Sequence, residues 1–480
     1  MARSTMPLVA LTGIAPSWRR YGIGRWAPRR VRFLSALLAC GGILLSSPSG
    51  SAAQEPPAWV EEESLVPMIC QRQEAVQVEG ARLPALLGRR LEDIRVYSSR
   101  GNRLEPIAFQ LDERDRKGRF VFPDGPERTV DPDPGLDGND VLLFMARDLG
   151  RMVYAPQTEQ GESFALTLKV TDPRDGSSGW AYVLCSPTPT PPCPEVCVRY
   201  TVKEGKYDRV DTPYYSILYP WGAYYANALV LHNAAGGRAV DLLDRFKARG
   251  TYPLFLSLFP FRSTEQEMPA RLVGVRAGPI RVVRRIEYGT ELGLGVRSLR
   301  FAAESLYDET HLSGALTDRV PARLDPFLKL ARAEVATDFN HHAYGMLFKN
   351  SRNPEGAVID GRMSPQESSL DLEPDEWRLV TGPQGTLFRE SLPGKDSASR
   401  AEVTLAYEDN IQLADGPEGE AGLVGCVRDR AETADLESGL FKTDAGFLIA
   451  PEYRPGDESM YLHWRSVPLQ VEVEDLAASE

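Results

Sequence analysis

The fold class is decided by the stretch FALTLKV at residues 164–170, which is followed after a polar turn by WAYVL at residues 180–184. Both runs are short, rich in β-formers and bounded by turn residues. Similar runs occur earlier in the chain, at residues 92–97, 106–111 and 141–146. This spacing is typical of an all-β sandwich, and we expect a small one over residues 54–185.

The second half of the chain is also strand-rich. RVVRRIEY at 281–288 and RSLRFAAE at 297–304 predict a hairpin around a Gly-rich turn. Helical signals are few, and the best of them is DLLDRFK at 241–247. We therefore expect a larger, supersandwich-like β-sandwich over residues 195–480, with its last strand at 467–473.

A proline-rich segment divides the two halves. Residues 186–194 read SPTPTPPCP. Closely spaced prolines favour an extended, semi-rigid spacer, so this segment is predicted to be an interdomain linker.

The first 53 residues have the organisation of an export signal. Several arginines precede an apolar run at 33–45, and the small residues Ser51, Ala52 and Ala53 form a cleavage site. The prediction is a protein of the periplasm, cell surface or exterior, without a later membrane span. A lipoprotein box ending at Cys40, a twin-arginine-like signal and an uncleaved anchor stay open as alternatives.

The net charge and the absence of certain motifs limit the classes of partner and cofactor that we expect. The formal net charge is −12, and removing residues 1–53 removes seven arginines and no acids. So acidic a chain disfavours nucleic acid and anionic lipid as partners and suits cation binding. No motif for covalent haem or for a nucleotide occurs. The expected partners are an extracellular or envelope protein, or a polysaccharide.

Five cysteines lie beyond the predicted signal. Because an oxidising compartment favours disulfides, we expect Cys193 to pair with Cys197 and Cys70 with Cys185, leaving Cys426 over. A zinc site built from Cys185, Cys193 and Cys197 is the alternative.

The sharpest local pattern is DPDPGLDGND at residues 131–140. Alternating acidic residues in a Gly-containing loop can supply the oxygen ligands that calcium requires. The candidate ligands are Asp131, Asp133, Asp137 and Asp140. The alternative is a plain acidic turn between two strands.

Two further groups are candidates for ligand binding. The aromatic cluster near residues 214–225 offers Tyr214, Trp221 and Tyr224, whose faces could stack on sugar rings or fill a core. Near the only histidine pair, Asp338 and His342 could share a face of a strand and act in ligand binding or acid–base chemistry.

A charged stretch, QLDERD at residues 110–115, has two interpretations. Asp112 or Glu113 could be an acid or a further metal ligand. Alternatively, the stretch is a salt-bridged strand end in which Arg114 compensates the carboxylates, and this second interpretation is favoured.

Two resemblances add to these observations. The stretches 106–115, 137–150 and 277–285, with Ile359-Asp360-Gly361, Trp377 and 382–385, resemble uncharacterised exported bacterial β-sandwich proteins. The second half, in its length and its Gly278-Pro279-Ile280-Arg281 strand entry, is loosely similar to the galactose-mutarotase type of large sandwich. That second resemblance implies a sugar-related activity, but the His and Glu pair on which mutarotases rely cannot be mapped onto this sequence.

The leading hypothesis is an exported, non-catalytic binding or structural protein, with calcium stiffening the acidic loop. The competing hypothesis is a carbohydrate-active enzyme or sugar-binding protein on a mutarotase-like sandwich. A surface scaffold that docks other exported proteins through the linker is a third. Because no convergent catalytic constellation occurs in the sequence, the catalytic residues stay unassigned.

Overall fold

The computed structural model places all the residues that it describes in one compact unit, Ala58–Glu480. It describes residues 69, 72–101, 103–154, 156, 164–187, 193–254, 259–266, 268, 270–289, 300–319, 332–373, 375–390, 402–410, 424–432, 440–450 and 453–476. The predicted signal peptide and Cys70 lie outside these residues. Within them, no helix has the length and apolarity that crossing a bilayer requires.

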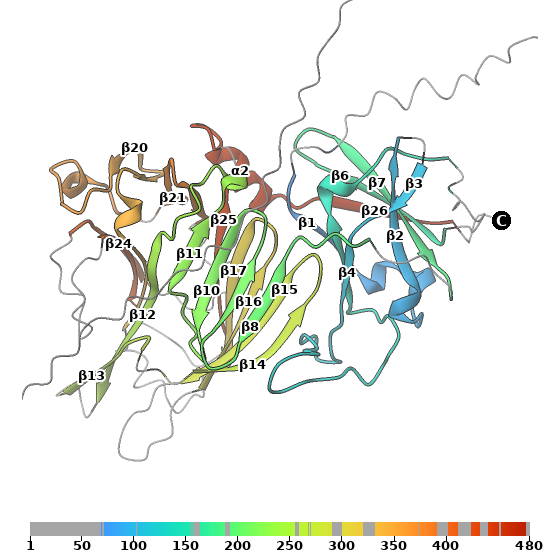
Figure 1. Ribbon diagram of the computed structural model, residues 1–480, viewed down its shortest axis with the longest axis horizontal. Helices are drawn as coiled ribbons and strands as arrows, with labels where there is room; N and C mark the ends of the chain where they lie inside the picture. The colour runs from blue at the N-terminus through green and yellow to red at the C-terminus, as the bar shows by residue number, and fades with distance from the viewer. Residues whose placement is uncertain are drawn as a thin grey trace, which may run out of the picture. The chain divides into compact units, whose positions relative to one another are not determined.

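Nearly all the regular structure is β, which confirms the predicted all-β fold class (Figure 1). One sheet has the order β26-β6-β7-β2-β3 and a second has the order β1-β5-β4, with every pair antiparallel. Their strands are β1 (Ala75–Glu79), β2 (Ile94–Arg100), β3 (Arg103–Pro106), β4 (Phe109–Asp112), β5 (Val141–Met145), β6 (Leu166–Thr171), β7 (Ser178–Cys185) and β26 (Gln470–Asp475).

Apolar side chains from these two sheets form one core. Val78 of β1, Ile94 of β2, Phe144 of β5, Leu168 of β6 and Val183 of β7 are all fully buried in it. The two sheets therefore make a small sandwich. The domain boundaries predicted from the sequence stay a prediction.

Strand β5 shows why its sequence, VLLFM, is apolar throughout rather than alternating. Leu142 and Phe144 pack into the core of the small sandwich, while Val141, Leu143 and Met145 belong to a second hydrophobic cluster. A strand covered on both faces has no position for a polar residue.

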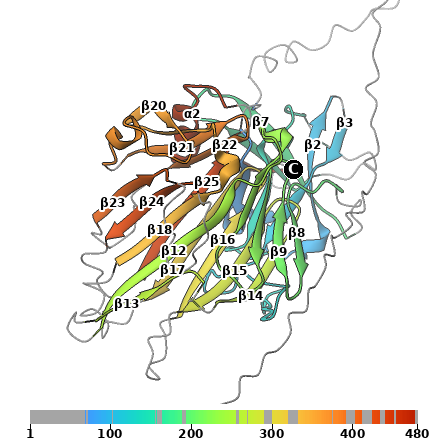
Figure 2. The ribbon, with the colours of Figure 1, turned by 60° about the vertical axis from the view of Figure 1, so that its left-hand side comes forward.

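Three more antiparallel sheets follow. Their orders are β11-β10-β9-β8, then β13-β12-β18-β24-β23, whose strands run side by side in Figure 2, and the nine-stranded β14-β15-β16-β17-β25-β22-β21-β19-β20. The strands are β8 (Arg199–Lys203), β9 (Tyr207–Asp211), β10 (Tyr215–Pro220), β11 (Ala228–Leu231), β12 (Leu243–Leu254), β13 (Phe259–Ser263), β14 (Ala270–Ala277), β15 (Val282–Gly289), β16 (Arg300–Tyr307), β17 (His311–Arg319), β18 (Arg332–Phe339), β19 (Leu347–Asn350), β20 (Asn353–Val358), β21 (Trp377–Gly382), β22 (Gly385–Glu390), β23 (Glu402–Glu408), β24 (Val424–Glu432) and β25 (Leu440–Ile449).

Helical structure is short. Besides α2 (Glu458–Ser466) there are single 3-10 turns, η3 (Gly80–Arg82), η4 (Pro84–Leu86), η5 (Leu91–Asp93), η6 (Ala146–Asp148), η7 (Asn233–Ala235), η9 (His341–Ala343) and η10 (Glu367–Ser369). Helix α2 packs Tyr461 and Trp464 against Trp377 and Phe388 of the nine-stranded sheet.

The predicted helix at 241–247 is wrong, because Leu243–Leu254 is strand β12 and pairs with β18. Leu242 and Leu243 are both buried, and Asp241 accepts backbone N–H bonds from Leu229 and Leu243 as a strand-end cap. The predicted hairpin is confirmed by the pairing of β15 with β16. The expected last strand begins three residues late, at Gln470, and joins the sheet of β6.

The predicted disulfides are also wrong. Cys185, Cys193 and Cys197 are free thiols, which excludes the Cys193–Cys197 bond and the pairing of Cys185 with Cys70. Burial raises the pKa of the Cys197 thiol to about 11. A thiol with so high a pKa is inert, and it serves here as a small apolar residue of the core.

Candidate functional site

A cleft of about 260 Å³ opens between strand β1, the start of strand β17 and the segment that joins helix α2 to strand β26. Four stretches line it that are far apart in the sequence, namely 74–77, Arg281, 306–313 and 464–471. The lining mixes two carboxyl groups, a guanidinium and an imidazole with aliphatic side chains. Such a mixture of apolar wall and few polar groups is typical of small-molecule sites.

Asp308 lies in the turn between β16 and β17, and its carboxylate organises that turn. Oδ1 accepts hydrogen bonds from the backbone N–H groups of Thr310 (3.1 Å) and His311 (2.6 Å), and Nδ1 of His311 lies 3.4 Å from it. Burial alone would raise the pKa of Asp308, but His311 and the two N–H groups lower it overall. Asp308 is therefore an ionised carboxylate, and 21 % of its side chain is exposed.

Glu74 reaches the cleft from the residue before β1. Its Oε1 accepts a hydrogen bond of 2.7 Å from Nη2 of Arg72, which is buried. Burial raises the pKa of Glu74 and Asp308 adds to the rise, while Arg72 and His311 oppose it. The two carboxyl groups of the cleft thus have pKa values shifted in opposite directions, as acid–base pairs in active sites often do.

Arg281 lines the cleft, but its positive charge is paired with the buried carboxylate of Asp112. Its Nε lies 2.5 Å from Oδ2 of the fully buried Asp112, and its Nη1 donates to Oε1 of Gln77 at 3.3 Å. Asp112 also accepts a 3.0 Å bond from Nε of Arg276. Oε1 of Gln110 accepts from the backbone N–H groups of Ile280 and Arg281.

These contacts decide between the two interpretations of residues 110–115. Asp112 is a buried salt-bridge acceptor, although its partners are Arg276 and Arg281 rather than Arg114. The sequence motif Gly278-Pro279-Ile280-Arg281 docks on the same residues. A Cβ on Gly278 would lie 2.1 Å from Oε1 of Gln110, so a larger residue there would displace the buried side chain of Gln110.

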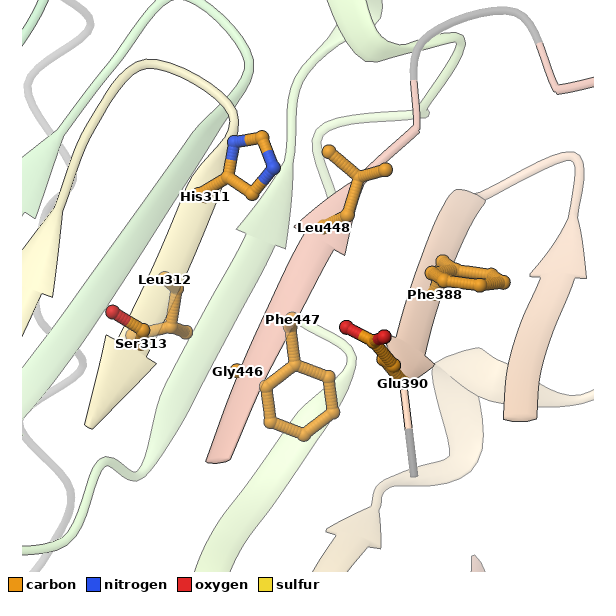
Figure 3. A pocket seen from close by; sticks show the side chains of 8 residues that line it. All are labelled: His311, Leu312, Ser313, Phe388, Glu390, Gly446, Phe447 and Leu448. Atoms are coloured by element: carbon orange, nitrogen blue, oxygen red, sulfur yellow. The ribbon is translucent and has the colours of Figure 1, made fainter. Parts of the chain in front are cut away.

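The cleft shares His311 and Ser313 with a narrow hollow on the nine-stranded sheet (Figure 3). The hollow also involves Phe447 and Leu448 of β25 and Glu390 of β22, brought together because β25 pairs with both β17 and β22. It encloses only about 10 Å³. That is room for no more than about one water molecule, so the hollow adds no space for a ligand to the cleft.

The acidic loop brings together three of its four candidate ligands. Carboxylate oxygens of Asp131, Asp137 and Asp140 lie within 4.8 Å of one another and could hold a metal ion. Asp133 is exposed and is not one of this group; its Oδ1 accepts from the N–H of Gly135.

The same carboxylates also form the turn. Asp140 accepts backbone N–H bonds from Arg114 and Asp137, and Asp137 accepts one from Asn139. Burial raises the pKa of Asp140 to about 6, and the neighbouring Asp137 adds to the rise although the backbone bonds oppose it. The loop therefore combines the geometry of a turn with a concentration of negative charge.

The aromatic candidates point to separate neighbours. Tyr214 packs against the larger hydrophobic core, whereas Tyr224 stacks on Tyr288 with ring centroids 4.7 Å apart. Trp221 is 42 % exposed. The residues that line the cleft do not include Tyr214, Trp221 or Tyr224.

Asp338 and His342 do not form a joint site. Asp338 is buried in β18 and forms a salt bridge with Lys247. His342 is exposed in η9, where its Nδ1 lies 2.8 Å from the backbone carbonyl of Asp241. The strand ends at Phe339, so the alternation on which the shared face depended does not extend to residue 342.

The cleft itself was not predicted from the sequence. Asp308 and His311 lie in the same turn, but Glu74 is far from them in the sequence and meets them only because β1 and the β16–β17 turn lie beside the segment after α2. The sequence does contain one local signal for this site, DETH at residues 308–311. An Asp in a turn between two strands often accepts backbone hydrogen bonds there, and this Asp is followed three residues later by a His.

Comparison with known proteins gives structural neighbours only. No family model and no curated protein matches the chain. An alpha-mannosidase from Enterococcus faecalis V583 aligns with 84 % of this chain and 45 % of its own, at 11 % identity and a TM-score of 0.45. A glycosyl hydrolase family 38 protein from Enterococcus faecalis aligns with 85 % of this chain and 46 % of its own, at 10 % identity and a TM-score of 0.42.

A galactose mutarotase-like protein from Clostridium acetobutylicum aligns with 59 % of this chain and 99 % of its own, at 8 % identity and a TM-score of 0.28. Mutarotase-like sandwich proteins are thus among the structural neighbours. The chain spans less than half the length of the two Enterococcus proteins. Similarities this distant say nothing about activity.

Proposed function

We propose that this protein is an exported carbohydrate-binding protein whose site is the cleft at Glu74, Asp308 and His311. The observation that supports the proposal most directly is the lining of that cleft. Glu74 and Asp308 offer hydrogen-bond acceptors to the cleft, and Gln77 and His311 offer donors. Aliphatic side chains, among them Leu306 and Val471, line the cleft beside these groups. Sugars present the same alternation of hydroxyl groups and C–H faces. Export rests on the predicted signal at residues 1–53.

Calorimetric titration of the full chain with a panel of oligosaccharides tests this function. Glu74→Gln and Asp308→Asn should each weaken binding of the saccharide that binds best by about tenfold, because each removes a charged hydrogen-bond acceptor. Both replacements are isosteric, so the fold should persist. Trp221→Ala should leave the affinity unchanged, and an affinity that falls with Trp221→Ala but not with the two cleft variants would contradict the assignment.

A carbohydrate-active enzyme is the second candidate, and one observation favours it. The pKa of Glu74 is raised while that of Asp308 is lowered, so one group can hold a proton when the other has lost it. Incubation with the bound saccharide, followed by chromatography, separates the two functions: an enzyme consumes the saccharide and a binding protein returns it intact.

Calcium at the acidic loop is a further part of the proposal. Three carboxylates with oxygens within 4.8 Å of one another supply oxygen ligands, and waters would complete the shell. At about 10 mM calcium and a Kd of about 1 mM, binding should stabilise the fold by about 1.4 kcal/mol. Melting curves in EDTA and in calcium check this.

The matched variants are Asp137→Asn and Asp133→Asn. The first should abolish the calcium-dependent rise in melting temperature, and the second should retain it, because Asp133 is not in the triad. An equal rise in the wild type and Asp137→Asn would show that calcium binds elsewhere.

A further inference from the structure

We propose that the cleft selects saccharides that carry a primary ammonium group, which lies between the carboxylates of Glu74 and Asp308. This inference rests on the proposed carbohydrate-binding function and names the class of sugar. It follows from the balance of charged groups that face the cleft.

The accessible charged atoms of the cleft are carboxylate oxygens. Oε1 of Glu74 is engaged by Arg72, but Oε2 has no partner among the described residues. In Asp308, Oδ1 accepts the bonds of the turn, and Oδ2 is likewise without a partner among them. The two side chains are 19 % and 21 % exposed, and both residues line the cleft.

The positive groups nearby are more deeply buried than the two carboxylates. Arg281 is 5 % exposed and directs Nε at the buried carboxylate of Asp112, and its Nη2 is buried without a hydrogen-bond partner. Arg72 is 1 % exposed and lies between Glu74 and Asp172. Nδ1 of His311 faces Asp308 and the hydroxyl of Thr310. Of the charged side chains that line the cleft, Glu74 and Asp308 are therefore the most exposed.

The two carboxyl groups line the same cleft and affect each other's ionisation. Burial raises the pKa of Glu74 and Asp308 adds to the rise, although Arg72 and His311 oppose it. An ammonium group between the two carboxylates would form strong, charge-assisted hydrogen bonds with both.

A saccharide suits the cleft better than a bare metal ion. Glu74 and Asp308 do not belong to the group of acidic residues that converges at metal-ligand spacing within the described part of the chain. The space of about 260 Å³ exceeds what an ion needs, and Ala75, Leu306 and Leu469 offer aliphatic surface to the C–H face of a sugar ring.

Calorimetry with a glucosamine oligosaccharide and its N-acetylated counterpart of equal length tests the proposal, because acetylation removes the charge and keeps the ring. At a pH where the amine is protonated, we expect the full chain to bind the amino form about tenfold or more tightly. Glu74→Gln and Asp308→Asn should reduce this preference to about threefold or less. Glu355→Gln, an exposed carboxylate of β20, is the matched control and should keep it.

The outcomes separate the two levels of the proposal. If the N-acetylated form binds equally or more tightly and the cleft variants still weaken it, the ammonium preference is overturned and the carbohydrate site stands. If the amino form binds with the same affinity to the cleft variants as to the wild type, its binding reflects only the acidic surface, and the preference is again overturned. If neither form nor any other saccharide binds, the proposed function fails with it.

Discussion

Replacing Asp112 by alanine should destabilise the fold by about 3–5 kcal/mol, which is the usual cost of leaving a buried charge without its partner. Asp112 is fully buried, and it is the carboxylate shared by the guanidinium groups of Arg276 and Arg281. Nε2 of Gln110 donates to it as well, at 2.7 Å. The alanine variant would leave the guanidinium of Arg281 without this carboxylate, while Arg276 would keep only the partly exposed Glu113 as a carboxylate partner.

Denaturant unfolding followed by circular dichroism measures this effect. Glu127→Ala is the matched control, because Glu127 also pairs with an arginine, Arg271, but both side chains are 48 % exposed. An exposed pair of this kind contributes at most about 1 kcal/mol. Unfolding midpoints that agree for Asp112→Ala and Glu127→Ala would contradict the account of the buried network.

A similarly large loss is expected for Asp208→Ala. Asp208 of β9 lies in a salt bridge with Arg284 of β15, and the two residues are each only 1 % exposed. The hydroxyl of Tyr200 also donates to Asp208, at 2.9 Å. Burial alone would lower the pKa of Arg284, but Asp208 raises it overall, so the arginine stays charged. We expect a loss of about 3–5 kcal/mol.

The double variant Asp208→Leu with Arg284→Met provides the control. Because it removes both charges and fills the space with apolar groups, it should recover most of the stability that Asp208→Ala loses. If the double variant is as unstable as Asp208→Ala, the cost lies in packing rather than in the unpaired charge. The guanidinium also lies 4.0 Å above the ring of Tyr219, so some packing loss is included in both variants.

The all-β class was predictable because the strands show a local alternation of polar and apolar residues. Strands such as Leu166–Thr171 and Val282–Gly289 occur where period-two patterns and turn residues placed them. The failures occurred where tertiary pairing overrides local preference. The DLLDRFK segment has helical spacing, but β18 offers a partner strand along Leu243–Leu254, and pairing with it buries Leu243.

Three of the four predicted ligands of the candidate metal site come together, because this site too depends on residues close in the sequence. Asp131, Asp137 and Asp140 lie within ten residues of one another, so a loop suffices to bring them together. The cleft was not predictable, because Glu74 and Asp308 are 234 positions apart in the numbering and depend on the relative placement of separate sheets. No local pattern encodes that placement.

A crystal structure of the full chain with the oligosaccharide that binds best in the titrations tests the assignment of the cleft. We expect the sugar to lie in the cleft, with its polar groups within hydrogen-bond distance of Glu74 and Asp308. A sugar bound instead over Trp221 and Tyr224, with the cleft empty, would contradict it.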